Sequence, residues 1–306
     1  MYTQRTYNGL TDQTIMQQLA LEYFTHQLHS IDLPYRFSSP ALEDTHNAAL
    51  WMDEQGNLAG WAVMQLPFWT VDIACRPDAV PQLYPLILQW AAQRGAELNA
   101  EGAEREAWFI PVFEDQQEYI CILEEHGWVS QTDAPVDTWS KVWMQHAGVQ
   151  AVPSTPAPVG YTVRPLRCDT EIDEYVDLHR SVFETKNMNL AWRRRILDHP
   201  ACQPQLNLMV EDSSGELCGF FIGWLGQVDG NVYGQVEPMG ISPAFQGAGL
   251  GRALLSEGLK RMYELGAGSV YVETDYFRGP ALALYERCGF VIRRKLPVFR
   301  KDFPLP

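Results

Sequence analysis

The sequence contains no uninterrupted apolar run that approaches the roughly 20 residues a membrane-spanning helix needs. Its first residues, MYTQR, also lack the apolar core of a signal peptide. The six cysteines are scattered and include no C-x-x-C pair, which argues against a disulfide framework and against a zinc cluster. These absences predict a cytoplasmic protein with no membrane segment and no bound metal.

Basic residues are scarce in the first half of the chain. Residues 1–150 hold 6 Lys and Arg against 20 Asp and Glu, a net charge of −14, whereas residues 151–306 hold 17 against 18, a net charge of −1. Nucleic-acid binding requires a basic face, so we expect no nucleic-acid partner. If a polyanionic ligand binds, the second half of the chain is where we expect it.

The 306 residues suffice for two domains of about 150 residues each, and the chain repeats itself at about that length. Four pairs of segments match in the same order, two at an offset of 159 and then one each at 166 and 162: 2–5 with 161–164, 53–61 with 212–220, 76–77 with 242–243, and 126–128 with 288–290. Between the copies, the proline-rich stretch VQAVPSTPAPVG is typical of a linker. The pattern predicts domains at 1–148 and 161–306, joined by a linker at 149–160.

Hydrophobic periodicity is clearer in the second copy. It predicts helices at 170–183, 190–197, 250–265 and 280–288, and strands at 161–166, 206–211, 217–225, 232–241, 269–274 and from 291 onward. Antiparallel strands come first and a strand–helix–strand unit follows. Each copy is therefore expected to be an α/β (α+β) domain, with a central mixed β-sheet flanked by helices.

A glycine-rich loop, QGAGLGR, leads from the strand at 232–241 into the next helix. Glycines let consecutive backbone N–H groups converge on one point, and the helix directs its positive end there as well. The loop is neither a P-loop, since no Gly-Lys-Ser/Thr follows, nor a G-x-G-x-x-G motif. It predicts a pyrophosphate site, and a tight turn into a helix is the alternative.

This loop and its surroundings resemble the GNAT superfamily of N-acetyltransferases. The superfamily's loop motif is Q/R-x-x-G-x-G/A, which Gln246, Gly249 and Gly251 satisfy. The loop follows ISPAF and precedes a helix, a strand and the pattern A-x-x-x-Y-x-x-x-G-F at 281–290. The strong match covers about residues 232–292, and the internal repeat extends it to a tandem GNAT-like arrangement.

The resemblance implies that acetyl-CoA is the cosubstrate and lies in a cleft where two strands of the second domain splay apart. The backbone of Met239, Gly240 and Ile241 would bind the pantetheine arm and the thioester carbonyl. The pyrophosphate would be bound by the loop, namely Gln246, Gly247, Ala248, Gly249, Leu250, Gly251 and Arg252. Arg278 replaces an asparagine of many members; it either reaches a CoA phosphate or is a solvated charge.

Acetyl transfer to an amine needs a neutral nucleophile, although an alkyl amine of pKa ~10.4 is mostly protonated at pH 7, and a departing thiolate benefits from a proton donor. Tyr285 stands at the superfamily's general-acid position; the alternative is a core aromatic. Glu237 resembles the strand glutamate that some members use as base, directly or through water, and the alternative is a solvent-facing or substrate-anchoring carboxylate. Glu273 is a reserve candidate.

The first copy lacks these features. The segment after Pro77, DAVPQLYP, contains no glycine and includes two prolines without N–H groups, and Leu123 occupies the position of Tyr285. This copy is expected not to bind CoA in the usual way. The basic run 193–195 is interpreted as a solvated helix face.

Two functions fit the sequence. The first is an acetyl-CoA-dependent N-acetyltransferase that acts on a primary amine of a small molecule or peptide. The second is a non-catalytic protein that binds or senses acyl-CoA. The intact loop and the Tyr285–Glu237 pair favour the enzyme, and the acidic first half suggests a cationic acceptor.

Overall fold

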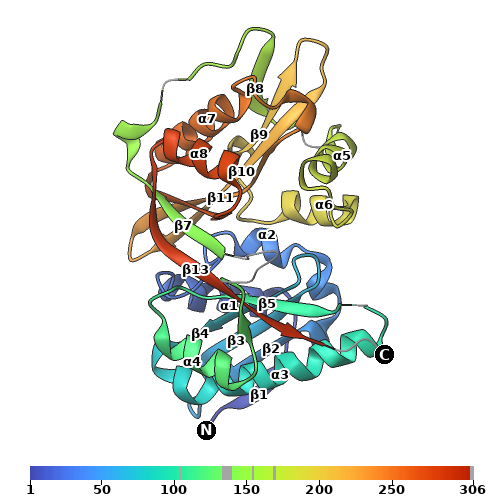
Figure 1. The fold of residues 1–306 in the computed structure, drawn as a ribbon, viewed down its shortest axis with the longest axis vertical. Helices are drawn as coiled ribbons and strands as arrows, with labels where there is room; N and C mark the ends of the chain where they lie inside the picture. The colour runs from blue at the N-terminus through green and yellow to red at the C-terminus, as the bar shows by residue number, and fades with distance from the viewer. Residues whose placement is uncertain (104, 133–139, 154, 168–169, 304–306) are drawn as a thin grey trace. The chain divides into compact units, whose positions relative to one another are not determined.

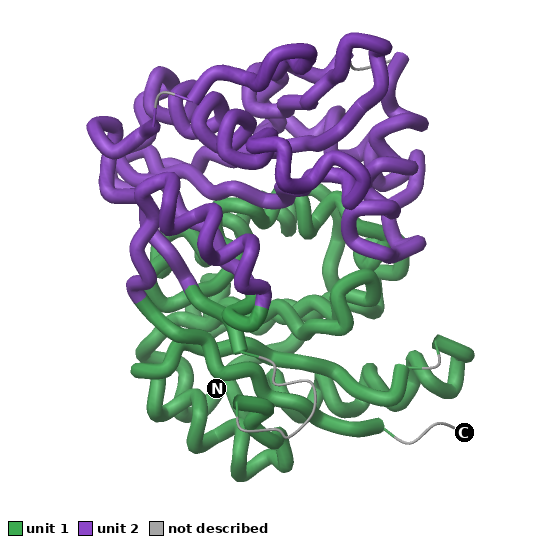
Figure 2. The backbone as a smooth tube through the Cα atoms, turned by 45° about the horizontal axis from the view of Figure 1, so that its top comes forward, with its two compact units in different colours: residues 1–142, 275–277, 294–306 green, residues 143–274, 278–293 purple. Residues whose placement is uncertain are grey.

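The chain forms two compact units in a computed structural model that describes residues 1–303 except 104, 133–139, 154 and 168–169 (Figure 1). Figure 2 colours unit 1, which comprises residues 1–142, 275–277 and 294–306, and unit 2, which comprises 143–274 and 278–293. These ranges depart from the predicted 1–148 and 161–306. Strands β7 (Ser140–His146) and β13 (Phe290–Asp302) account for most of the difference, because each strand is divided between the units.

The sheet of unit 1 is completed by the end of the chain. Its order is β1 (Thr3–Thr6), β2 (Ala48–Met52), β3 (Leu58–Gln65), β4 (Thr70–Cys75), β5 (Ala107–Pro111) and then β13, with β6 (Val129–Ser130) also pairing with β13. The β4–β5 pair is parallel, and β13 pairs with β5 antiparallel, from Val298 opposite Pro111 to Asp302 opposite Ala107. A C-terminal strand therefore belongs to the fold of the first copy.

Both faces of this sheet are buried, because successive strand residues point to opposite sides. On one face, Ala49 and Trp51 pack with α3 (Val80–Ala100) and α4 (Gln117–Glu125). On the other face, Ala48 and Leu50 pack with α1 (Leu10–Glu22) and α2 (Leu33–Phe37). The result is a helix–sheet–helix sandwich.

Unit 2 has the same element order. It comprises β8 (Tyr161–Pro165), α5 (Ile172–Phe183), α6 (Leu190–Asp198), β9 (Asn207–Asp212), β10 (Leu217–Val228), β11 (Asn231–Ile241), α7 (Leu250–Glu264), β12 (Ala267–Asp275) and α8 (Gly279–Arg287). The sheet order is β7-β12-β11-β10-β9-β8, and β11–β12 is the parallel pair. These elements confirm the predicted helices and strands to within a few residues. The strands expected from 291 onward are one strand, β13.

Equivalent contacts recur in the two copies at the predicted offsets. Arg5 donates two hydrogen bonds of 2.7 Å to Asp12, and 159 positions later Arg164 donates bonds of 2.6 and 2.9 Å to Glu171. Each pair ties the first strand of its copy to the start of the first helix. The backbone repeats too, since the N–H of residue 76 donates to the carbonyl of residue 59, and that of residue 242 to residue 218, both at 2.9 Å.

Three sequence-based expectations concerned membrane segments, metal sites and disulfides. Over the described ranges, each helix is too short or too polar to cross a bilayer. In the same part of the chain, no three or more His, Cys, Asp or Glu side chains form a group that could hold a metal ion. Five cysteines are free thiols, and Cys168 lies outside the described residues.

The Arg164 cluster generates a pH-dependent stability prediction. A hydrogen bond from Arg164 lowers the pKa of Glu211 to about 2, below the roughly 4.3 of an unfolded glutamate. The ionised carboxylate therefore stabilises the fold fully above about pH 4.3, and this contribution is lost as the pH falls toward 2. We expect Arg164→Met to lower the free energy of unfolding by about 2 kcal/mol at pH 7.

Urea unfolding at pH 7, 4 and 3 checks this prediction. The difference in the free energy of unfolding between Arg164→Met and the wild type should become smaller as the pH falls. Arg300→Met is the control, because Arg300 and Asp302 form an exposed pair whose loss should change stability little. If the difference in the free energy of unfolding stays constant with pH, the effect comes from packing of the arginine's methylene groups and not from its charge.

Candidate active site

The glycine-rich loop between β11 and α7 has the backbone geometry of an anion site. Gly247 and Gly249 both have φ = +80°, a region that favours glycine. Gly249 is the N-cap of α7 and supplies no side-chain hydrogen bond to the first turn. The first N–H groups of the helix are therefore available to a ligand or to water. Residues 246–249 are exposed, as access for a ligand requires.

Two contacts hold the start of α7 beside the end of β11. The side-chain amide of Gln246 donates to the carbonyl of Ile241 at 3.2 Å. Gly251 lies in the first turn, where an added Cβ would be 3.2 Å from Leu284 Cδ2 and 3.6 Å from Ile241 Cγ1. This glycine lets α7 approach α8 closely, whereas the sequence had suggested a role only in the loop.

Strand β11 parts from its parallel neighbour before it reaches the loop. The register with β12 runs from Val232 opposite Ala267 to Gln235 opposite Tyr271, while β11 continues to Ile241 and β12 to Asp275. Residues 239–241, predicted to bind pantetheine, lie beyond this register and pair with β10 on their other side. The structure thus places them where the two strands separate.

A β-bulge lies in β11 at Glu237. Met239 faces Phe221 and Val236 faces Gly223 across the β10–β11 pair, so two residues of β11, Glu237 and Pro238, stand opposite one residue of β10. The extra residue bends a strand and redirects its side chains, which is common beside active sites. The candidate base therefore projects from an irregular point of the sheet.

Tyr285 on α8 combines a buried ring with a charged neighbourhood. It is 8% exposed, and its ring meets Phe290 edge-on at 5.5 Å. Burial raises the pKa of its hydroxyl, the charge of Glu237 raises it further, and the charge of Arg278 opposes the shift. The hydroxyl is therefore protonated at neutral pH, as a proton donor must be. Glu237 and Arg278 therefore lie close enough to Tyr285 for their charges to act on its hydroxyl.

The surroundings of these residues differ in exposure. Glu237 is half-buried, whereas Arg278 is exposed and forms the N-cap of α8. Burial also raises the pKa of Tyr175, on α5, to about 12; the charge of Arg193 lowers it, and that of Glu237 raises it. Glu237 therefore acts electrostatically on tyrosines from two helices.

The expectation of a solvated basic run at 193–195 is wrong for Arg193, which is 0% exposed. Its guanidinium lies 3.6 Å from the ring centroid of Tyr175 and donates to Asn207 Oδ1 at 2.7 Å. Arg194 is exposed. The helical spacing of Arg193 with Ile196, on the inward face of α6, was a signal that the interpretation of a charge run overlooked.

In the first copy, the chain itself fills the corresponding cleft. β4 and β5 pair at Thr70 and Phe109, and the segment 26–29 lies against both strands. The amide of Gln27 donates to the carbonyl of Cys75 at 2.7 Å, and at the offset of 166 Cys75 corresponds to Ile241. The space that remains between this segment and the strands is about 40 Å³.

The first copy also has no counterpart of the loop. At the offset of 166, residues 246–249 correspond to 80–83, which already form the first turn of α3 directly after the turn Pro77–Ala79. Leu123, at the position of Tyr285, is 0% exposed and belongs to the apolar core. These features agree with a first copy that has lost the site.

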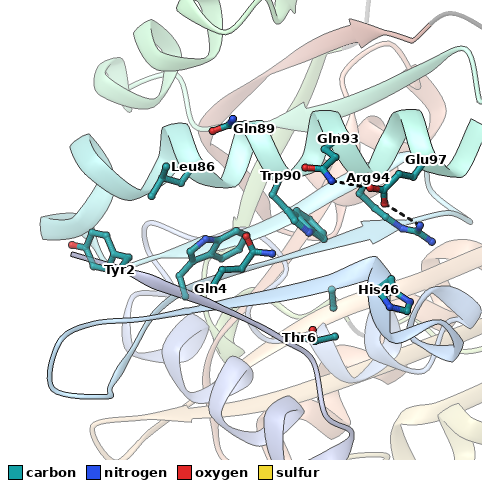
Figure 3. Close-up of a pocket in the computed structure, with 12 residues that line it drawn as sticks. Tyr2, Gln4, Thr6, His46, Leu86, Gln89, Trp90, Gln93, Arg94 and Glu97 are labelled. Atoms are coloured by element: carbon teal, nitrogen blue, oxygen red, sulfur yellow. Dashed lines mark hydrogen bonds and ion pairs between the residues drawn. The ribbon is translucent and has the colours of Figure 1, made fainter.

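A hollow of about 460 Å³ in unit 1 is a second candidate (Figure 3). It lies between β1 and α3, and Trp51 meets Trp90 edge-on at 5.9 Å beside it. Its cation, Arg94, is already paired with Asp44, Glu97 and Glu101. Because three carboxylates already hold Arg94, the loop of unit 2 is the stronger candidate for binding an anionic ligand.

Comparisons with known proteins identify a family and relatives that this chain resembles. The acetyltransferase (GNAT) family model matches residues 170–290. A mycothiol acetyltransferase of Propionibacterium freudenreichii subsp. shermanii is 30% identical over 128 residues, which are 40% of this chain and 41% of the relative. The chain thus covers less than half of that relative's length.

Two solved structures match the fold over almost the whole chain. A GCN5-related N-acetyltransferase from Sphaerobacter thermophilus has a TM-score of 0.65 at 16% identity and covers 98% of this chain and 95% of its own. A tandem GNAT protein from the clavulanic acid biosynthesis pathway has a TM-score of 0.66 at 14% identity and covers 99% of each chain. At these identities the likeness establishes the fold.

Proposed function

We propose that this chain is an N-acetyltransferase, because the acetyltransferase (GNAT) family model matches residues 170–290 and a solved tandem GNAT protein shares its fold over 99% of the chain. It transfers an acetyl group from acetyl-CoA to a primary amine of a small molecule or peptide. The reaction takes place in unit 2, and the first copy contributes no second site.

One observation carries this proposal: an uncapped helix start, a parting of parallel strands and a buried tyrosine beside a carboxylate occur together in one copy. The N–H groups at the start of α7 and the positive φ of Gly247 and Gly249 suit a pyrophosphate. The parting of β11 from β12 beyond Gln235 leaves backbone groups for a pantetheine arm.

In this proposal, acetyl-CoA supplies an activated acetyl group and a thiol leaving group. The loop residues 246–252 bind the pyrophosphate, and the backbone of residues 239–241 orients the pantetheine arm and the thioester. The charge of Arg278 partly offsets the rise in the pKa of the Tyr285 hydroxyl that burial and Glu237 cause.

The proton transfers fall to two side chains. Glu237 takes a proton from the acceptor ammonium, directly or through water, and keeps the amine neutral. Tyr285 gives its proton to the departing thiol. Because burial raises the pKa of Tyr285, its hydroxyl is protonated at neutral pH, which is the state a general acid must start from.

The acceptor is assigned by class. The name of the curated relative, mycothiol acetyltransferase, makes a small-molecule acceptor the first choice for this chain. The net charge of −14 in residues 1–150 favours a cationic amine.

The decisive experiment is release of free thiol from acetyl-CoA with a panel of primary amines, including polyamines, amino sugars and short peptides. Acceptor-dependent thiol release supports the enzyme. Binding of acetyl-CoA without turnover across the panel would instead support the alternative, a protein that binds or senses acyl-CoA.

The loop prediction concerns Gly249→Asp. This change puts a carboxylate and a Cβ at a φ of +80° where the phosphate approaches, so the affinity for CoA should fall at least 100-fold.

Calorimetry with CoA should return one site per wild-type chain, because Gln27 closes the cleft of the first copy.

Gly266→Asp is the matched control for the loop, since Gly266 follows the C-terminal end of the same helix with a φ of +92°. It should lower stability to a similar degree and leave CoA affinity intact. Equal affinities for the two variants, or two equivalent sites in the wild type, would contradict the assignment.

The general-acid prediction concerns Tyr285→Phe. The change keeps the ring and its packing on Phe290 and removes only the hydroxyl, so kcat should fall about 10²–10⁴-fold with little change in CoA affinity. Steady-state kinetics and calorimetry check both parts. Tyr263→Phe removes a hydroxyl that is hydrogen-bonded to His146 and should keep wild-type kcat. A wild-type rate in Tyr285→Phe would make Tyr285 a core residue.

The base prediction concerns Glu237→Gln, which removes the charge and keeps the shape. The rate should fall at pH 7 and partly recover as the pH approaches the ~10.4 pKa of an alkyl amine, because solvent then supplies free amine. A pH–rate profile checks this. If Glu273→Gln shows this pattern and Glu237→Gln does not, the base is Glu273.

A further inference from the structure

Trp224 on β10 makes a specific contact with the bulge. Its side chain is 0% exposed, and its indole N–H donates a hydrogen bond of 2.6 Å to the backbone carbonyl of Glu237. The indole therefore binds the peptide that carries the candidate base.

The bulge explains why this carbonyl needs a side-chain donor. Glu237 and Pro238 share one position opposite β10, so the regular ladder is interrupted there. Pro238 has no N–H to contribute. A carbonyl buried without a donor is costly, and the donor that replaces the ladder determines where the peptide lies.

The first copy supports a link between this tryptophan and the bulge. Its β3–β4 pair keeps one register from Gly60 opposite Cys75 to Gln65 opposite Thr70. Gln65 occupies the position 159 residues before Trp224, and its amide donates to the carbonyl of Arg36. The copy without the cofactor loop thus has a continuous strand pair and no tryptophan at this position.

We propose that Trp224 is a positioning residue of the acetyl-transfer site. Its indole N–H holds the Glu237 carbonyl, and so keeps the Glu237 carboxylate and the Met239 N–H in place for the amine and the thioester. Trp224 acts through the backbone and touches no reacting atom. This inference rests on the proposed function, because its kinetic consequence requires that Glu237 act in catalysis.

Trp224→Phe removes the indole N–H, and Trp61→Phe is a matched control. Trp61 is 1% exposed and donates its indole N–H to the carbonyl of Met16 at 2.9 Å in unit 1. Both variants lose one buried indole–carbonyl bond, so their urea unfolding midpoints should fall by similar amounts. Only Trp224→Phe should lower kcat, by about 10- to 100-fold, with an unchanged Kd for CoA.

Equal kcat in the two variants would overturn the proposal. If Trp224→Phe does not fold, 3-benzothienylalanine at position 224 replaces only the N–H by sulfur and keeps the ring. A wild-type kcat with that residue would also overturn it.

An independent readout separates this inference from the proposed function. Amide hydrogen exchange at Met239 should be faster in Trp224→Phe than in Trp61→Phe, whether or not the wild type transfers acetyl groups. Unchanged exchange at Met239 would show that the indole does not hold the bulge. Faster exchange in a chain without transferase activity would reject the function and retain the positional role.

Discussion

Backbone polar groups that leave regular pairing must find another partner, and this constraint governs both copies of the fold. Where parallel strands part, or where a bulge interrupts an antiparallel pair, carbonyl and N–H groups lose their partners on the neighbouring strand. In the first copy the amide of Gln27 satisfies the carbonyl of Cys75. In the second copy Trp224 satisfies the carbonyl of Glu237, and the start of α7 keeps N–H groups for a ligand. The same scaffold thus satisfies these carbonyls with side chains from different elements in the two copies.

The contacts that both copies share are those that hold the scaffold. The arginine–carboxylate pair between the first strand and first helix recurs at the offset of 159. The contacts that differ surround the cleft: the glycine loop, the bulge and the tyrosine of α8 are found in unit 2. This division is what duplication followed by loss of one site would leave, because the fold depends on the shared contacts alone.

Each copy of the sequence depends on the other copy for a strand of its sheet. The end of β13 completes the sheet of unit 1, and Phe299 and Phe303 enter its core. Trp143, from the first copy's sequence, stacks on Tyr271 of β12 in unit 2, with ring centroids 4.3 Å apart. Neither half of the chain contains all the strands of its own sheet, so we expect neither half to fold alone.

Local sequence determined the elements and the loop of this protein. Periodicity located the helices and strands of the second copy, matching segments indicated the duplication, and Gly247 and Gly249 indicated the proposed anion site. Each of these signals lies within a short stretch of chain. Tertiary structure alone decided the exchange of β7 and β13 and the insertion of Gln27. Each of these joins residues far apart in sequence, and pairing and burial across such separations leave no local pattern.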